Sequence, residues 1–240
     1  MEILGNHHRQ TKNHTSGTHR ARSPEETLRQ CSTLMERIGI TRLANVTGLD
    51  FVGIPVYMAI RPTSRTLCVS QGKGVDKVSA KVSALMESIE GWHAERIELP
   101  LRYESFHALR KAETVMEVGE LQLASGGSFD PNRPLLWCRG YDLLQHESLW
   151  VPFDCVSLSS VRPTEGRATF FRSTNGLASG NHLLEATLHA LCEVIERDAS
   201  ALWFSDPVDP SGKQTQVDAA TVDDSICRTA VCLLYTSRCV

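Results

Sequence analysis

The sequence predicts an α+β fold in which short antiparallel strands alternate with long amphipathic helices. Apolar residues occur in short runs broken by glycine and proline, such as "GIPVYMAIRP" and "SLWVPFDCVSL", a pattern typical of antiparallel strands. The heptapeptide "ALMESIE", which begins at Ala84, recurs as "ALCEVIE" at Ala190, each time inside a helical pattern of apolar residues. Because the strands look antiparallel, an α+β arrangement fits better than a doubly wound parallel sheet.

The first half of the chain predicts a helix, three strands and a second, longer helix. Ser23 reads as a helix N-cap, followed by Pro24 and two glutamates, and this helix should run to about Ile38. The runs "TRLANVTGLD", "GIPVYMAIRP" and "RTLCVS" predict the strands. The glycine-rich stretch "QGKGVD" then leads into a helix over about residues 77–96.

The second half predicts a short helix, two strands and a second copy of a strand, loop and helix unit. "SFHALRKAE" reads as helical, and "LLWCRGYDLL" and "SLWVPFDCVSL" read as strands. "ATFFRSTNGLASG" predicts a further strand with its glycine-rich loop, before a helix over about residues 182–203. A shift of 106 residues aligns Gly74 with Gly180, Glu87 with Glu193 and Glu90 with Glu196. Both helices of the repeat therefore carry an E-x-x-E pair.

Composition limits the classes of partner. The 240 residues carry a net charge of −3 with acids and bases intermixed, which argues against nucleic acid or an anionic membrane as the main partner. There is neither an apolar run of about 18 residues nor a signal-peptide pattern, so we expect a cytoplasmic protein. Eight cysteines without a C-x-x-C pair predict free thiols, mostly buried, in place of disulfides.

The two ends differ in character from the middle of the chain. Residues 1–22 are polar and rich in histidine, and we expect a disordered segment there in preference to a metal-binding tract. The last nine residues, "CLLYTSRCV", match nothing in the preceding organisation, and "CLLYTS" resembles the translation of a sequencing adaptor. We therefore expect an incomplete domain over residues 23–231 and a non-native tail over residues 232–240.

The repeated carboxylates are the strongest chemical signal. Glu87 and Glu90 lie three residues apart, so they share one face of their helix, and the matched Glu193 and Glu196 do the same. Solvated acidic faces commonly carry Lys or Arg four residues later, and of these four only Glu193 has one, Arg197. Hard oxygen ligands without thiolates suit Mg²⁺, and this many carboxylates would serve more than one ion and a polyphosphate. A merely solvated acidic surface is the alternative.

The glycine-rich loops leave two interpretations open. "SQGKG" fails the Walker pattern, because that motif needs glycine where Leu67 stands and a hydroxyl residue where Gly74 stands. It can be a tight strand-to-helix turn or a loop whose backbone approaches phosphate, and "NGLASGN" has the same ambiguity. The chain has no nucleophile-elbow motif, so nucleophilic catalysis by its own side chains is not expected.

These motifs in combination resemble the YcaO family. The resemblance is carried by "GITRLANVTGLDFVGIPVYMAIRP", "SQGKG", Ser83-x3-Glu87-x2-Glu90, "NGLASGN", Glu185 and "EVIERD", and it extends from about Gly17 to Trp203. It implies the YcaO-like fold, in which the repeated unit forms a pseudo-symmetric nucleotide cleft, together with binding of ATP and Mg²⁺ without a Walker loop. Gly91 departs from the family, which frequently has Arg there, and His189 stands at a position of Gln.

The resemblance also assigns roles to individual residues. The metal-binding acids of the family fall on Glu87, Glu90, Glu193 and Glu196. Its nucleotide-contacting positions fall on Arg20, Thr27, Ser83, Asn181, Glu185 and Arg197. Arg197 would also act as the catalytic residue, because its positive charge would stabilise the phosphoryl group during transfer.

The implied activity is ATP-dependent O-phosphorylation of peptide backbone amides, which leads to azolines or thioamides in ribosomally made peptides. The implied partners are a peptide or protein substrate and a leader-peptide-binding or TfuA-like protein, and a homodimer is expected. The alternative is a non-catalytic accessory factor that supports methylthiolation of a ribosomal protein. The third nucleotide motif of the family and its Pro-rich C-terminal end are not found in this sequence, so we expect the fragment alone to be inactive.

Overall fold

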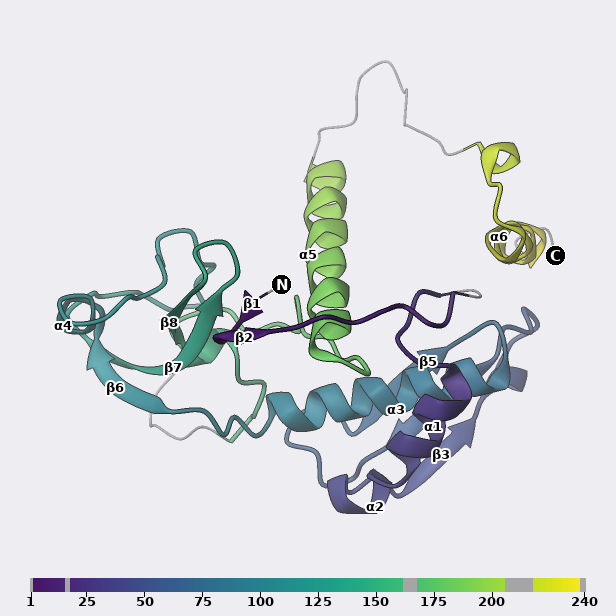
Figure 1. Ribbon diagram of the computed structural model, residues 1–240, viewed down its shortest axis with the longest axis horizontal. Coiled ribbons are helices and arrows are strands. Elements are labelled where there is room, and N and C mark those ends of the chain that lie inside the picture. The colour runs from purple at the N-terminus through teal and green to yellow at the C-terminus, as the bar shows by residue number, and fades with distance from the viewer. Residues whose placement is uncertain (1, 16–17, 162–167, 206–217, 238–240) are drawn as a thin grey trace.

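The computed structural model describes residues 2–15, 18–161, 168–205 and 218–237 (Figure 1). Its helices and strands, in chain order, are β1 (Glu2–Ile3), β2 (Asn6–His7), α1 (Pro24–Ser32), α2 (Met35–Ile38), β3 (Arg42–Asn45), β4 (Val56–Ile60), β5 (Val69–Lys73), α3 (Lys77–Ala94), β6 (Leu101–Ser105), α4 (Phe106–Leu109), β7 (Pro134–Asp142), β8 (Glu147–Pro152), α5 (Leu183–Ser205) and α6 (Ser225–Ser237). Every strand pairing between these elements is antiparallel, which confirms the predicted α+β class.

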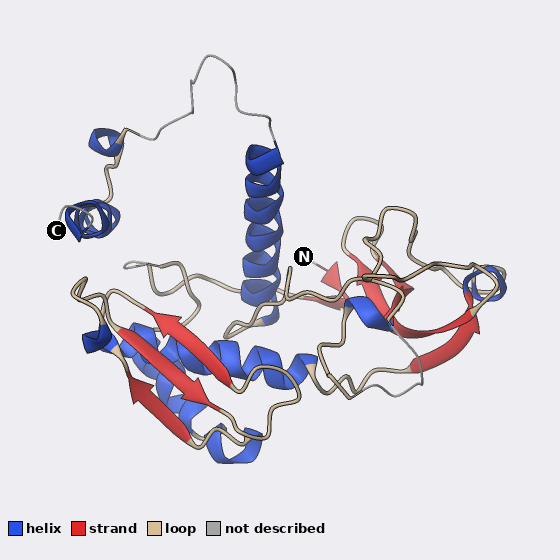
Figure 2. Ribbon diagram, turned by 180° about the vertical axis from the view of Figure 1, so that it is seen from behind, coloured by secondary structure: helices blue, strands red, loops and turns tan. Residues whose placement is uncertain are grey.

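The first layered unit is a sheet of order β3-β4-β5 covered by helices on one face (Figure 2). In β4 the side chains alternate between intermediate and buried positions, as expected for a strand with one face toward a core. Its buried Ala59 packs with residues of α1 and α3 in one cluster, which includes Cys31, Ala84 and Leu85. The first sheet therefore provides a rigid base on which α3 is held.

Small residues allow α3 to lie close to β5. Gly72 faces this helix, and a Cβ atom at this position would lie 2.0 Å from the backbone nitrogen of Ala84 and 2.3 Å from the carbonyl oxygen of Ala80. Both alanines are fully buried. Asp76 then caps the helix by accepting a hydrogen bond from the Ser79 backbone N–H at 2.8 Å. Packing and capping together fix which face of α3 points away from the sheet.

The second layered unit is a sheet of order β6-β7-β8 with its own aromatic core. Trp137 is fully buried and its indole N–H donates to the carbonyl of Glu104 at 2.9 Å. Phe106 from α4 and Phe170 from the chain before α5 belong to the same cluster. Phe170 thus anchors the segment that leads toward α5.

The first predicted helix begins as expected but is interrupted. Ser23 and Glu26 form the reciprocal hydrogen bonds of a capping box. The helix ends at Ser32, and a separate turn, α2, reaches the predicted end at Ile38. Thr33 explains the break, because its hydroxyl donates to the carbonyl of Gln30 at 2.7 Å and so competes with the helical pattern.

The strand predicted before the second helix is not formed within residues 168–180. The described chain makes only a single bridge there, between Leu123 and Phe170. The matching strand of the first unit, β5, is stabilised by its ladder with β4, whereas no such neighbour accompanies the second unit in the described residues. The repeat is therefore retained in the loop and helix and lost in the strand.

Two further expectations from the sequence concern membrane-spanning helices and the cysteines. No helix among the described residues is long and apolar enough to cross a membrane. The described cysteines are free, as predicted, but the expectation that most are buried is wrong, since Cys68, Cys192, Cys227 and Cys232 are exposed.

Candidate functional site

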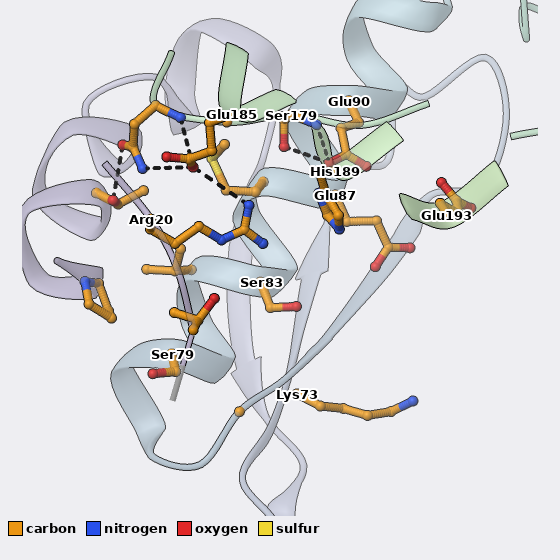
Figure 3. A pocket seen from close by; sticks show the side chains of 18 of the residues that line it. Arg20, Lys73, Ser79, Ser83, Glu87, Glu90, Ser179, Glu185, His189 and Glu193 are labelled. Atoms are coloured by element: carbon orange, nitrogen blue, oxygen red, sulfur yellow. Dashed lines mark hydrogen bonds and ion pairs between the residues drawn. The ribbon is translucent and has the colours of Figure 1, made fainter. Parts of the chain in front are cut away.

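A cavity of about 570 Å³ lies where the end of β5, one face of α3, the start of α5 and residues 18–27 meet (Figure 3). Its charged lining is balanced, because four carboxylates face four cationic side chains. These residues are Glu87, Glu90, Glu185, Glu193, Arg20, Arg22, Lys73 and Arg197. Such a mixed lining can hold cations and anionic groups together, as a metal-bound phosphate requires.

Glu87 and Glu90 project from α3 on successive turns toward this cavity (Figure 3). Burial raises the pKa of Glu87, and the neighbouring charge of Glu90 raises it further. Burial likewise raises the pKa of Glu90, where repulsion from Glu193 adds to the effect and hydrogen bonds from Ser179 oppose it. Glu90 thus lies between two other acids, and a cation would relieve the repulsion among the three.

The α5 side of the cavity supplies Glu193 and Arg197. Their side chains form an ion pair one helical turn apart, with 2.5 Å between a guanidinium nitrogen and a carboxylate oxygen. Both line the cavity, together with His189 on the preceding turn. Arg197 is therefore placed where it could contact an anionic ligand once that pair is exchanged for other partners.

The N-terminal segment closes another side of the cavity through Glu185 and Asn181. Glu185 accepts a hydrogen bond from the backbone N–H of Ala21 at 2.6 Å, and its other oxygen lies 3.5 Å from the Arg20 guanidinium. The hydroxyl of Thr27 donates to the side-chain oxygen of Asn181 at 3.0 Å. These contacts bring together four of the predicted nucleotide-contacting residues from distant parts of the chain.

The structure places nine of the ten predicted site residues on the cavity, and Ser83 is among them. Glu196 is exposed and does not line it. In both ribbon views α5 stands across α3, and its Glu193 and Arg197 line the cavity whereas Glu196 does not (Figures 1 and 2). A role for Glu196 in metal binding stays a prediction.

The two glycine-rich loops share one local geometry. A Cβ atom on Gly74 would lie 2.5 Å from the Ala80 backbone nitrogen, and one on Gly180 would lie 2.7 Å from that of Ala186. In each unit the glycine therefore permits close packing against the first turn of the helix six residues ahead. Both loops also line the cavity. Each loop can therefore be a tight turn into its helix and also approach a bound phosphate.

Lys73 and Ser179 are two of the cavity-lining residues that were not assigned from the sequence. Lys73 lines the cavity and its positive charge lowers the pKa of Glu87, opposing the raising causes. Ser179 donates from both its backbone N–H and its hydroxyl to Glu90, at 2.8 and 2.5 Å. The repeat could have indicated both residues, because Ser179 stands 106 residues after Lys73. Each directly precedes one of the two aligned glycines, Gly74 and Gly180.

The donor set fits Mg²⁺ in chemistry, although the ligands are not gathered. Carboxylate oxygens that are partly desolvated and mutually repelling favour a hard cation. Among the described residues, however, no group of three or more His, Cys, Asp or Glu side chains is close enough to hold a metal ion as it stands. Binding would therefore require Glu87, Glu90 and Glu193 to move their carboxylates together, with phosphate oxygens and water completing the shell.

Curated proteins similar to this chain come from bacteria and an archaeon. An uncharacterized protein of Mycobacterium tuberculosis is 40% identical over 200 residues, covering 83% of this chain and 45% of the relative. One from Rhizobium leguminosarum bv. trifolii, described as lying in the tfuA 3' region, is 36% identical and covers 86% and 49%. One from Methanothermobacter thermautotrophicus is 39% identical and covers 85% and 51%. The chain therefore spans about half the length of these relatives.

Solved structures share the fold. YcaO from Methanopyrus kandleri, bound with AMPPCP and Mg²⁺, is 27% identical with a TM-score of 0.59, covering 81% of this chain and 48% of that one. A heterocyclase in complex with substrate and cofactor has a TM-score of 0.77 at 21% identity, covering 99% and 34%, a likeness of fold alone. The family model described as YcaO cyclodehydratase, ATP- and Mg²⁺-binding, matches residues 71–235. The chain therefore belongs to the YcaO family.

Proposed function

We propose that this chain binds ATP with Mg²⁺ and, as part of a longer protein, activates backbone amides of a peptide or protein substrate by O-phosphorylation. The observation that carries the proposal is that Glu87, Glu90 and Glu193 line one cavity together with Lys73 and Arg197. Acids with unrelieved repulsion need cations, and the cationic side chains around them need anions. A metal-bound triphosphate satisfies both at once.

Each part of the site has a role in this proposal. Glu87, Glu90 and Glu193 would hold the cations, and Glu196, which does not line the cavity, is a proposed ligand only. Arg197 would leave Glu193 when a cation takes that carboxylate, and its guanidinium would then stabilise phosphoryl charge. The remaining proposed nucleotide contacts are Arg20, Thr27, Ser83, Asn181 and Glu185.

The chemistry follows from the poor leaving-group character of an amide oxygen. Bound ATP would transfer its γ-phosphoryl group to this oxygen and leave as ADP. A Cys, Ser or Thr side chain, or sulfide, would then attack the amide carbon, lose its proton and expel the oxygen as inorganic phosphate, which gives an azoline or, with sulfide, a thioamide. The cavity contributes charge and orientation, and no side chain of this chain needs to act as a nucleophile. This is consistent with the absence of a nucleophile-elbow motif in the sequence.

The comparisons support proposals about partners. One relative is described by its place beside tfuA, which supports a TfuA-like partner, and a leader-peptide-binding protein is the alternative. A heterocyclase of the same fold was solved with its substrate. We further propose a cytoplasmic homodimer, in keeping with the free thiols of the described cysteines.

A second candidate function is a non-catalytic accessory factor that supports methylthiolation of a ribosomal protein. The observation that favours it is that the acids do not form a ready-made metal site in the described residues. The two candidates differ in turnover, since an accessory factor would not release phosphate in response to a peptide.

The test uses a full-length chimera, in which the matched part of this chain replaces the corresponding 200-residue region of the Mycobacterium tuberculosis relative. Phosphate release is measured with a panel of Cys- and Ser-containing peptides. Glu87→Gln and Glu193→Gln should each lower peptide-dependent release about a hundredfold or more, or roughly 3 kcal/mol, with circular dichroism unchanged. The exposed Glu120→Gln is the matched control and should stay within about threefold. Equal turnover in all variants would overturn the proposal.

A further inference from the structure

One carboxylate of the site is held by a residue from the other copy of the repeat. Glu90 comes from α3, and Ser179 comes from the loop before α5, 89 residues later. Ser179 donates to the carboxylate twice, from its backbone N–H at 2.8 Å and from its hydroxyl at 2.5 Å (Figure 3). Charge-assisted hydrogen bonds of this length are among the stronger ones in proteins.

Both hydrogen bonds reach the same oxygen, Oε1. Within the described chain, no hydrogen bond or ion pair is made to Oε2. The carboxylate is thus held through one oxygen while the other remains available on the cavity. A metal-binding carboxylate is commonly arranged in this way, because a hydrogen bond to one oxygen fixes the direction of the other.

The loop that carries Ser179 is itself firmly placed. The backbone N–H of Leu177 donates to the carbonyl of Thr174 at 2.9 Å, and that of Asn181 donates to Glu185 at 3.1 Å. Gly180, between them, packs against the first turn of α5. A hydrogen-bond donor on a fixed loop can orient the carboxylate that accepts from it. A donor on a loose loop would move together with the carboxylate and would not orient it.

The repeat gives the same position a related task in the first copy. Lys73, at the end of β5, precedes Gly74 as Ser179 precedes Gly180, and its positive charge lowers the pKa of Glu87 without a hydrogen bond or ion pair to it among the described residues. The aligned position is therefore a lysine near one acid of α3 in the first copy and a serine hydrogen-bonded to the other acid in the second. A neutral hydroxyl on Glu90 preserves its negative charge for a cation, which a lysine would neutralise.

We propose that Ser179 is a positioning residue, which orients Glu90 so that its Oε2 receives a divalent cation and which thereby sets the metal affinity of the site. This inference rests on the proposed function. The hydroxyl contributes one of the two hydrogen bonds, so Ser179→Ala should weaken the binding of metal without removing the site. Outer-shell substitutions of this kind typically lower metal affinity about tenfold to a hundredfold.

The experiment measures Mn²⁺ binding by electron paramagnetic resonance in the presence of AMPPCP. Ser179→Ala should weaken Mn²⁺ binding about tenfold, and Ser179→Thr, which keeps a hydroxyl, should restore it to within about threefold of wild type. Ser173→Ala, on an exposed residue of the same loop that does not line the cavity, is the matched control and should leave binding unchanged. Thermal unfolding of each variant checks that the fold is kept.

A double-mutant cycle with Glu90→Gln separates positioning from direct ligation. If Ser179 acts through Glu90, then Ser179→Ala should have little further effect on Mn²⁺ affinity in the Glu90→Gln background. An equal loss in both backgrounds would show that the hydroxyl acts independently and would overturn the proposal. Wild-type affinity in Ser179→Ala would overturn the positioning role and leave the proposed function standing. A wild-type chain that binds no Mn²⁺ with AMPPCP would overturn both.

Discussion

The backbone N–H of Ala21 donates a hydrogen bond to Glu185 across 2.6 Å, although the two residues are 164 positions apart in the sequence. The Arg20 guanidinium lies 3.5 Å from the other oxygen of the same carboxylate. Glu185, on the first turn of α5, therefore holds the chain around Arg20 and Ala21 against the cavity. The proposed nucleotide site depends on this contact for Arg20, whereas Thr27 is placed by α1 and by its hydrogen bond to Asn181.

Glu185→Ala should release the N-terminal segment. The variant leaves the Ala21 N–H without its acceptor and Arg20 without its ion pair, a loss of about 1 to 2 kcal/mol that corresponds to a five- to thirtyfold rise in local opening. Tryptic cleavage between Arg20 and Ala21 should accelerate accordingly, as followed by mass spectrometry. Cleavage after the exposed Lys12 provides the internal reference. If both sites are cut at unchanged relative rates, the contact does not hold the segment.

Gly74→Ala and Gly180→Ala should each destabilise the fold by about 1 to 3 kcal/mol, because the added methyl group would overlap the first turn of the following helix. Urea unfolding measures the loss. Gly119→Ala is the control, since a Cβ atom there meets no heavy atom within 4 Å. If all three variants unfold at the same urea concentration, Gly74 and Gly180 are not needed for close packing against the helices.

The buried pair of Arg61 and Glu95 should make stability fall in acid. Burial opposes ionisation of Glu95, but hydrogen bonds from Arg61, Ser64 and Thr66 outweigh it and lower the pKa from 4.5 to about 2. The ionised form is thus favoured by folding, so its contribution is complete above pH 4.5 and disappears as the pH falls toward 2.

Glu95→Gln should therefore cost about 3 kcal/mol at pH 7, since it leaves a buried guanidinium unpaired, and much less near pH 2. Chemical unfolding at several pH values measures the difference between variant and wild type. A difference that is independent of pH would contradict this assignment.

Glu90→Gln should act in the opposite direction on the metal-free protein. Burial and the neighbouring charge of Glu193 raise the pKa of Glu90, so its stabilising contribution is present below pH 4.5 and lost as the pH rises through the raised value. Removing the charge should therefore raise the melting temperature at pH 7 in the presence of a chelator, measured by calorimetry. A lower melting temperature would mean that the carboxylate is already compensated.

The sequence predicts the parts of this fold that depend on local periodicity. The helices α3 and α5 begin and end within about two residues of their expected limits, because their apolar residues recur at helical spacing. The break at Thr33 and the missing strand before Gly180 were not predicted. The first depends on one side-chain hydrogen bond, and the second depends on whether a partner strand is present.

Prediction of the site from the sequence also fails where the result depends on how distant parts of the chain are arranged. The repeat grouped Glu87, Glu90, Glu193 and Glu196 as metal ligands, and the first three line one cavity whereas Glu196 does not. An offset in sequence does not specify how two helices are oriented in space, so it could not separate Glu196 from Glu193. Ser179 was not assigned because its partner, Glu90, lies 89 residues away and only the folded chain brings them together.

The most direct test of the central claim is the Mg²⁺ dependence of nucleotide binding, measured by calorimetric titration of this chain with AMPPCP. Wild type should bind at least tenfold more tightly with Mg²⁺ than with a chelator, and Glu90→Gln should lose most of that difference because the variant lacks a charged ligand. Glu120→Gln should behave like wild type. Equal affinity with and without Mg²⁺ in wild type, or a full Mg²⁺ effect in Glu90→Gln, would contradict the account.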